Sequence, residues 1–552
     1  MPAKLLDHLA RRVLVLDGAM GTQVHEHDLD VETDYCGCEN CTDVLVKSRP
    51  DLIQQIHENY LEAGADAIET NSFGGARHVL GEFDLQNETY DLAKRAAEIG
   101  RAAADKHSTT DKPRFVLGSM GPGTKLITLN QIDWPTLVAS YREAMRGLID
   151  GGADAILIET CQDLLQVKGA INAALGVLDD TGKTPDDVPI MVSVTIEQTG
   201  TMLMGTSIEA ALIALRGYPI ASLGLNCATG PTEMAEHIHH LAKHWDRHIS
   251  VLPNAGLPVM VEGRAEFPLR SEPFAEAMLR FIEHDRVSAV GGCCGTTPEH
   301  IRQLAKLVNG RAPAKRDVTP PPPAATSLYA PTEFRQDASF LIIGERCNAS
   351  GSRKFKQLLE AEDWDSIVSL AREQVRDGSH VLDINVDYAG RDNASDMREV
   401  VSRIAKQVDA PLMLDSTQPA TIEAGLMHAP GKCIINSANF EDGEEKFDQL
   451  CRLAKTYNAA LVIGTIDEDK EAAMARTADR KLAIATRAIE RATTHHDIPR
   501  SDIFIDPSSC PSRPAWTPTG ARPLSSSRAR AASPRRSPMC RSRAGSPTSR
   551  SA

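Results

Sequence analysis

Short apolar runs alternate with helical stretches along the first 310 residues of the chain. Each run ends in glycine or a polar residue, and apolar residues then recur at helical spacing, most clearly over residues 299–308. Eight such runs are found, at residues 13–22, 65–73, 115–122, 153–160, 190–196, 221–230, 249–256 and 287–296. Eight strand–helix units in a segment of this length predict a (β/α)8 TIM barrel over residues 1–310.

The same pattern restarts after residue 336 and predicts a second barrel over residues 336–507. Six apolar runs carry it, at residues 340–351, 380–387, 411–417, 433–439, 460–468 and 503–507. A barrel closes only when its first and last strands pair, so six strands leave two open edges. The expected fold class is therefore α/β, with two tandem (β/α)8 barrels, the second of which is incomplete.

Two segments of biased composition flank the second barrel. Residues 311–335 include four consecutive prolines, at 320–323, which predicts an extended, semi-rigid linker. Residues 508–552 hold nine arginines but no lysine, aspartate or glutamate, and show neither a strand nor a helix period. Such a segment cannot build a core, so we expect a disordered tail. A shifted reading frame in a GC-rich coding sequence would explain its composition, and a native basic tail is the alternative.

Composition and charge exclude several classes of protein. The net charge of −15 argues against a general nucleic-acid surface. No apolar run approaches the ~18–20 residues of a membrane span, and the N-terminus has no signal-peptide core. We therefore expect a cytoplasmic protein without membrane or nucleic-acid partners. In such a protein the 12 cysteines are expected to be thiols or metal ligands rather than disulfides.

Three cysteines lie at the predicted ends of two strands of the first barrel. Cys227 follows the sixth strand, and Cys293 and Cys294 follow the eighth. Barrel active sites lie at the carboxyl ends of strands, and a single strand separates these two, so the thiolates can converge on one ion. Three thiolates leave one tetrahedral position open, as in catalytic zinc sites, and that position suits a substrate thiol. The alternative is a core thiol beside a chance pair.

A second group of cysteines competes for the role of metal site. Cys36, Cys38 and Cys41 have ligand-like spacing in the first predicted loop. Zinc fingers need a second ligand pair, and none lies nearby in the sequence. We therefore interpret this group as structural or incidental.

Four motifs of the first barrel resemble, in order, those of the homocysteine S-methyltransferase family. They are LDGAMGT (16–22), ETNSF (69–73), GLNC (224–227) and GGCCGT (291–296). The resemblance runs through residues 1–310 and implies a zinc-dependent barrel that methylates homocysteine, with Cys227, Cys293 and Cys294 as its catalytic zinc ligands. It also implies contacts with the amino-acid end of homocysteine from Asp17, Glu159 and Asn226. For these three side chains, hydrogen bonds that support the barrel rim are the alternative.

The second barrel resembles the pterin-binding family, and within it the folate module of cobalamin-dependent methionine synthases. The motifs are GERCNASGSRKF (344–355), LDIN (382–385), LDST (414–417), INS (435–437) and FIDP (504–507). Aspartate and asparagine at strand ends can match the donors and acceptors of a flat pterin ring. The resemblance implies folate contacts from Gly351, Ser352, Arg353, Asp415, Asn436 and Asp506, with Asn385 as a further candidate. For a single aspartate a helix N-cap is the alternative, and for Arg353 a solvated surface position.

The order of the parts resembles the front half of cobalamin-dependent methionine synthases. This implies methyl transfer from 5-methyltetrahydrofolate, by way of cobalamin, to zinc-bound homocysteine. The chain has no Asp-x-His-x-x-Gly cobalamin motif. We therefore expect a chain truncated before the cobalamin module, which relies on a separate cobalamin-binding protein or on added methylcobalamin. We also expect the second barrel to bind folate weakly or not at all.

Two other functions stay open. One is a stand-alone homocysteine S-methyltransferase that uses a small methyl donor such as S-methylmethionine or betaine. The other is a non-catalytic module that binds zinc or folate and acts only with partner chains. The folate motifs at 344–355 and 382–385 count against the first, and the missing carrier module keeps the second open.

Overall fold

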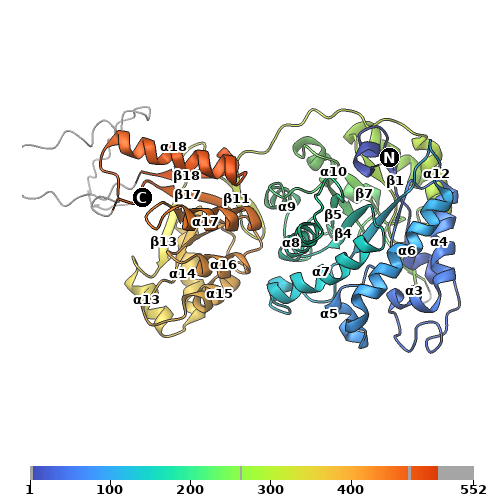
Figure 1. Cartoon of the computed structure of the whole chain (residues 1–552), viewed down its shortest axis with the longest axis horizontal. Coiled ribbons are helices and arrows are strands. Elements are labelled where there is room, and N and C mark those ends of the chain that lie inside the picture. The colour runs from blue at the N-terminus through green and yellow to red at the C-terminus, as the bar shows by residue number, and fades with distance from the viewer. Residues whose placement is uncertain (1–3, 262–263, 470–473, 508–552) are drawn as a thin grey trace, which may run out of the picture.

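The computed structural model describes residues 4–261, 264–469 and 474–507 (Figure 1). In the first domain eight parallel strands form one sheet in the order β1-β10-β7-β6-β5-β4-β3-β2. A parallel bridge between Leu16 and Ala67 joins the two ends of this order and closes the barrel. The strands are β1 (Leu14–Val15), β2 (Ala67–Glu69), β3 (Phe115–Met120), β4 (Ala155–Cys161), β5 (Ile190–Val194), β6 (Ser222–Asn226), β7 (Ser250–Leu252) and β10 (Ala289–Val290). The predicted α/β barrel is confirmed.

Helices surround this barrel on the outside (Figure 1). The main ones are α4 (Pro50–Ala63), α6 (Thr89–His107), α7 (Trp134–Asp150), α8 (Leu164–Asp180), α9 (Ile208–Leu215), α10 (Pro231–His244), α11 (Ser271–Arg280) and α12 (Pro298–Val308). Shorter ones are α1 (Leu5–Leu9), α2 (Met20–Val24), α3 (Leu45–Ser48) and α5 (Arg77–Leu80), and a small hairpin joins β8 (Val259–Val261) to β9 (Arg264–Glu266). No helix of the described residues is long and apolar enough to cross a membrane.

Local sequence signals set the ends of these helices. Helix α4 has Pro50 in its first turn, where the missing N–H has no intrahelical partner to lose. It ends at Gly64, whose φ of 118° lies in the left-handed region that terminates helices. Helix α7 begins after Asp133, whose side chain accepts a hydrogen bond from the Thr136 amide. Such signals are local and therefore readable in the sequence.

The interior of the first barrel is filled with apolar side chains at its amino-terminal end. Strand residues pointing inward form one buried cluster, which includes Leu14, Phe115, Leu157, Met191 and Ala289. A larger apolar layer lies between the strands and the surrounding helices. The polar strand-end residues are thus left at the carboxyl-terminal mouth.

The second domain holds six parallel strands in sequence order, from β13 to β18. The strands are β13 (Ile343–Asn348), β14 (Val381–Asn385), β15 (Leu412–Asp415), β16 (Ile434–Ala438), β17 (Ala460–Gly464) and β18 (Ile503–Asp506). The helices are α13 (Arg353–Glu360), α14 (Trp364–Arg376), α15 (Asn393–Ile404), α16 (Pro419–Leu426), α17 (Glu444–Tyr457) and α18 (Ala478–His495). Within the described part of the chain, β13 and β18 each pair on one side only, as six strands require.

Part of the segment predicted as an extended linker is folded. Its second half forms the antiparallel hairpin of β11 (Ala324–Thr326) and β12 (Pro331–Glu333). The Thr326 amide donates to the carbonyl of Lys432 at 3.1 Å, and the side chains of Ala325 and Leu328 are buried. The hairpin contacts both domains, because the Ser207 amide of the first donates to the carbonyl of Tyr329 in the hairpin turn at 3.0 Å. The predicted tail, 508–552, lies outside the described residues.

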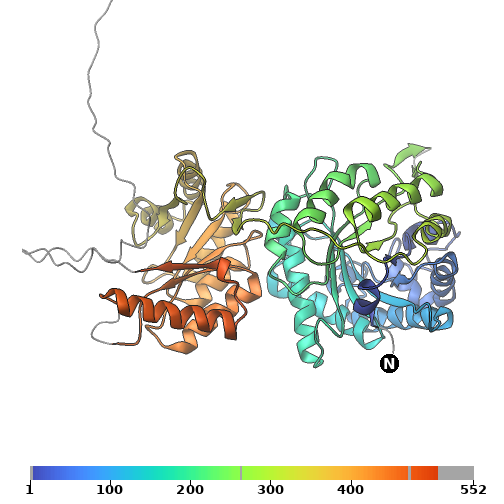
Figure 2. The same cartoon turned by 90° about the horizontal axis from the view of Figure 1, so that it is seen from above.

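The two barrels pack against each other through α8 and α9 of the first (Figures 1 and 2). The buried Lys168 ammonium of α8 donates to the carbonyls of Ala429 and Gly431, both at 3.1 Å. The Asn458 side chain donates to the carbonyl of Ala214 in α9 at 2.8 Å. Residues 429–431 and 458 directly precede β16 and β17. The amino-terminal end of the second barrel therefore faces the side of the first, and its mouth points away.

Candidate functional site

Three cysteine sulfurs converge at the mouth of the first barrel. The Sγ atoms of Cys227, Cys293 and Cys294 all lie within 4.8 Å of one another, and those of Cys227 and Cys294 are 3.8 Å apart. Four tetrahedral zinc–sulfur bonds of about 2.3 Å place neighbouring sulfurs about 3.8 Å apart. The spacing therefore fits one zinc ion with a fourth position left for another ligand.

The competing cysteine group is not arranged in this way. Cys36 is exposed, Cys38 is half-buried and Cys41 is buried. Among the residues that the structure describes, the trio at the mouth is the one group of three or more possible ligand side chains at metal-binding distances.

The backbone of Cys227 turns sharply where β6 ends. Cys227 and Ala228 have φ values of 62° and 55°, in the left-handed region that is costly for residues with a Cβ. The Cys227 amide donates to the carbonyl of Leu252 on the neighbouring strand at 3.1 Å. This turn directs the Cys227 side chain toward the loop after β10.

The loop that carries the other two cysteines depends on close backbone approach. A Cβ on Gly292 would lie 2.4 Å from the Thr296 hydroxyl, and Gly295 has a φ of 78°. The Thr296 hydroxyl donates to the carbonyl of Cys293 at 2.6 Å, and the Cys293 amide donates to the carbonyl of Pro253 at 2.9 Å. The glycines of the motif thus permit a tight, internally bonded loop.

Hydrogen bonds among the thiols separate their pKa values. Bonds from Cys293 and Cys294 lower the pKa of Cys227 to about 3. The same hydrogen bonding, together with burial, raises the pKa of Cys294 to about 12 and that of Cys293 well above its usual value. At neutral pH the trio thus holds one thiolate and two neutral thiols. Only a cation between the sulfurs would favour three thiolates. The donor set suits a zinc ion.

Three carboxyl groups lie beside this site. Burial raises the pKa of Asp17 and Glu69 well above the usual range and that of Glu159 to about 7, and repulsion from Glu159 adds to the shift of the other two. The Asp17 Oδ1 and Glu69 Oε1 atoms are buried without a hydrogen-bond partner among the described residues. A cationic group would find unsatisfied acceptors here.

Asn226 orients one of these carboxyl groups. Its Nδ2 donates to Glu159 Oε2 at 3.2 Å and to the Thr160 hydroxyl at 2.8 Å. The other Glu159 oxygen accepts from the Ser119 hydroxyl at 2.5 Å. The structure therefore brings Asp17, Glu159 and Asn226 together, with Asn226 in a supporting position. Glu69 was missed, although it opens the ETNSF motif.

A second polar network lies at the mouth of the second barrel. Asn348 Nδ2 donates to Asp383 at 2.8 Å and to Asp415 at 3.0 Å, and Asn385 Nδ2 donates to Asp415 at 3.1 Å. Burial raises the pKa of Asp383 to about 6 and also raises that of Asp415. Asn348 and Asp383 were missed as site residues, although both lie within the motifs at 344–355 and 382–385.

The remaining predicted folate residues are more dispersed. Ser352 accepts a hydrogen bond from the Phe355 amide and so caps α13, while Gly351 and Arg353 beside it are exposed. Asn436 lies in β16, next to Asp415 on the neighbouring strand. Asp506 is exposed at the end of the edge strand β18. The structure thus groups Asp415 and Asn436 and places the others around the rim.

Comparison with known proteins identifies the family. The family model for homocysteine S-methyltransferase matches residues 14–308, which is more than half of the chain. The chain belongs to the homocysteine S-methyltransferase family. A second model, for pterin binding enzymes, matches residues 344–515. The cysteine trio and the polar network of the second barrel fall within these two matches.

Two curated relatives are similar over most of the chain. The methionine synthases of Mycobacterium tuberculosis and Mycobacterium leprae are 47% and 45% identical over 505 and 510 residues. Each alignment covers 91% of this chain but only 42% of the relative, so the chain spans less than half of their length. Among solved structures, the oxidized form of the homocysteine methyltransferase MmuM from Escherichia coli is 22% identical, with a TM-score of 0.43, over 55% of this chain and 97% of its own.

Proposed function

We propose that this chain binds zinc through Cys227, Cys293 and Cys294 and methylates the thiol of homocysteine to make methionine. The observation that carries the proposal is the convergence of the three sulfurs at the barrel mouth, all within 4.8 Å of one another. When bound, zinc supplies a Lewis acid that favours the thiolate form of a substrate thiol at neutral pH.

The carboxyl groups of Asp17, Glu69 and Glu159 hold the ammonium group of the substrate in this proposal. Asp17 Oδ1 and Glu69 Oε1 have no other hydrogen-bond partner among the described residues. A charge-assisted hydrogen bond to an ammonium satisfies such acceptors and offsets the repulsion between the carboxylates. Asn226 keeps Glu159 in place through its 3.2 Å bond.

The methyl group comes from 5-methyltetrahydrofolate, by way of cobalamin held on a separate module or protein. The support is the pterin-binding match over 344–515 and the 45–47% identity to methionine synthases. In the second barrel, Asp383 and Asp415 offer carboxylate acceptors, and Asn348, Asn385 and Asn436 offer amides, for a pterin ring. Asp506 would contribute from an exposed edge strand, so we expect weak folate binding.

A cytoplasmic location is part of the proposal. All ten cysteines of the described residues are unpaired. Free thiols are typical of a reducing compartment.

One assay on the full chain tests the function. The zinc content is measured by metal analysis, and homocysteine is offered with methylcobalamin or with S-methylmethionine. We expect about one zinc per chain and methionine formation from methylcobalamin. Transfer from S-methylmethionine alone would instead identify an enzyme with a small donor, and no transfer at full zinc occupancy would identify a non-catalytic module.

The ligand assignment is tested by Cys294→Ala, with Cys451→Ala as the matched control. Cys451 is buried in α17 of the second domain, away from the trio. We expect Cys294→Ala to lose both zinc and methyl transfer, while Cys451→Ala keeps both. Full zinc occupancy in Cys294→Ala would overturn the assignment.

A further inference from the structure

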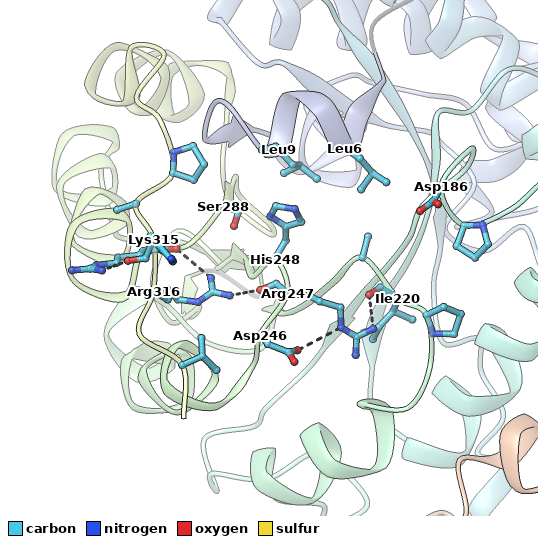
Figure 3. Close-up of a pocket in the computed structure, with 18 residues that line it drawn as sticks. Leu6, Leu9, Asp186, Ile220, Asp246, Arg247, His248, Ser288, Lys315 and Arg316 are labelled. Carbon is cyan, nitrogen blue, oxygen red and sulfur yellow. Dashed lines mark hydrogen bonds and ion pairs between the residues drawn. The ribbon is translucent and has the colours of Figure 1, made fainter. Parts of the chain in front are cut away.

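A hollow of about 720 Å³, lined by the residues drawn in Figure 3, lies at the amino-terminal end of the first barrel, whereas the cysteine trio follows the carboxyl ends of strands. Its walls are α1, the ends of the loops that lead into β6, β7 and β10, and residues 313–318, which follow α12. Small-molecule sites in proteins have volumes of ~300–1,000 Å³. The hollow is therefore large enough for a ligand of modest size.

The charged groups around this hollow are mostly positive. Arg247, Arg286, Lys315 and Arg316 line it, against two carboxylates, Asp186 and Asp246. Asp246 pairs with Arg216, which lies outside the lining, at 3.1 Å, and with Arg247 inside it at 3.8 Å. The chain as a whole carries a charge of −15, so a concave site with excess positive charge is a local feature.

Two of the guanidinium groups are held in place by backbone carbonyls; Arg247 also has Asp246 at 3.8 Å, whereas Arg316 has no carboxylate partner among the described residues. Arg247 donates to the carbonyls of Ile220 at 2.8 Å and Arg216 at 2.6 Å. Arg316 donates to the carbonyls of Trp245 at 3.1 Å and of Arg247 (Figure 3). Burial lowers the pKa of Arg247 to about 10 and also lowers that of Arg316. Carbonyl oxygens orient both cations, but the charge of Arg316 would be compensated only by an added anion.

The hollow also offers unused donors and an apolar wall. Among the described residues, neither the Lys315 ammonium nor the His248 ring has a hydrogen-bond or ion-pair partner. Leu6 and Leu9 of α1 line the side facing His248, and Ile220 adds a further apolar surface (Figure 3). A ligand that matches both parts has an anionic head and a short apolar body.

We propose that this hollow binds a small amphipathic anion, with its carboxylate or phosphate group at Lys315 and Arg316 and its apolar body on Leu6 and Leu9. Residues 313–318 lead from the first barrel to the second, so a bound anion would fasten this connection to the first barrel. The site is separate from the cysteine trio, and it stands whether or not the chain methylates homocysteine.

Calorimetric titration of the full chain tests the site with two probes, phenyl phosphate and benzoate. We expect saturable binding of at least one probe. Binding of phenyl phosphate alone would assign a phosphate head, and binding of benzoate alone a carboxylate head. No saturable binding of either probe at millimolar concentration would overturn the proposal.

Two variants locate the bound probe. Lys315→Glu reverses a charge at the rim of the hollow and is expected to weaken binding at least ten-fold. The control Lys306→Glu makes the same change at an exposed position of α12, outside the lining, and is expected to leave binding unchanged. Leu6→Trp fills the apolar part without changing charge and is also expected to weaken binding. Equal affinity in Lys315→Glu and Lys306→Glu, or undiminished binding by Leu6→Trp, would overturn the site.

Discussion

At the scale of single residues, Gly292 controls the geometry of the cysteine loop without contributing a ligand. A Cβ at this position would lie 2.4 Å from Thr296 Oγ1, so Gly292→Ala must displace the loop. Gly21 is a matched control, since a Cβ there meets nothing within 4 Å. We expect Gly292→Ala to weaken zinc affinity by about ten-fold or more, as for lost support around ligands, and Gly21→Ala to leave it unchanged. Competition with a chromophoric chelator measures this, and equal affinities would contradict the role of the loop.

Asp43 makes the stability of the first barrel depend on pH. Burial raises its pKa from 3.8 to about 7, and the amides of Asp43 and Gly74 offset this only in part. A carboxyl group with a raised pKa binds its proton more tightly in the folded state. Its contribution to the free energy of unfolding is therefore fully present below pH 3.8 and is lost as the pH rises through about 7.

Asp43→Asn should remove this dependence, because the amide stays neutral. Between about pH 5 and pH 8 we expect the variant to lose less unfolding free energy than the unchanged chain, by on the order of 2–4 kcal/mol. Urea unfolding at both pH values measures the difference, with the exposed Asp91→Asn as control. An identical pH dependence in Asp43→Asn and Asp91→Asn would disprove the assignment.

At the scale of elements, the edges of the second sheet should be its least protected strands. Strands β13 and β18 pair on one side only among the described residues, whereas β15 and β16 pair on both. Amides at open edges exchange through small local openings, while central strands need larger ones. We expect protection factors in β13 and β18 to be lower by about ten-fold or more than in β15 and β16. Hydrogen exchange followed by mass spectrometry measures this, and uniform protection across the sheet would contradict it.

The elements that could be predicted are those with local signals. Short apolar runs marked β3, β4 and β5, and the six strands of the second sheet. The hairpin of β11 and β12 was missed, because it has three residues per strand and includes Pro331. Its stability comes from contacts such as the Thr326–Lys432 hydrogen bond, which no local pattern shows.

At the scale of the whole molecule, Lys168 couples the two barrels. Its buried ammonium donates to the carbonyls of Ala429 and Gly431 in the other barrel, and burial lowers its pKa to about 8. Lys168→Met keeps the side chain at a similar length but leaves both carbonyls without this donor. Each buried acceptor left unsatisfied costs about 1–3 kcal/mol.

We therefore expect Lys168→Met to weaken the association of the barrels. Urea unfolding should show a lower midpoint and a wider separation between the transitions of the two barrels than in the unchanged chain. Lys183→Met, at an exposed position of the first barrel, is the control and should change neither quantity. An unchanged midpoint in Lys168→Met would show that the interface does not depend on this side chain.

The sequence by itself determined the two sets of strands, the order of the domains and the position of Cys227, Cys293 and Cys294 at strand ends. These features rest on local periodicity and on the rule that barrel sites lie at carboxyl ends. The tertiary structure decided the closure through Leu16 and Ala67, and the 3.8 Å separation of two sulfurs.

The tertiary structure also decided which polar side chains meet. It placed Glu69 beside Asp17 and Asn348 between two aspartates, and it laid residues 313–318 along a hollow at the far end of the barrel. These contacts join residues far apart in the chain, and their distances depend on strand register and loop conformation. A one-dimensional pattern predicts the elements, but it carries no information on how their ends are placed in space.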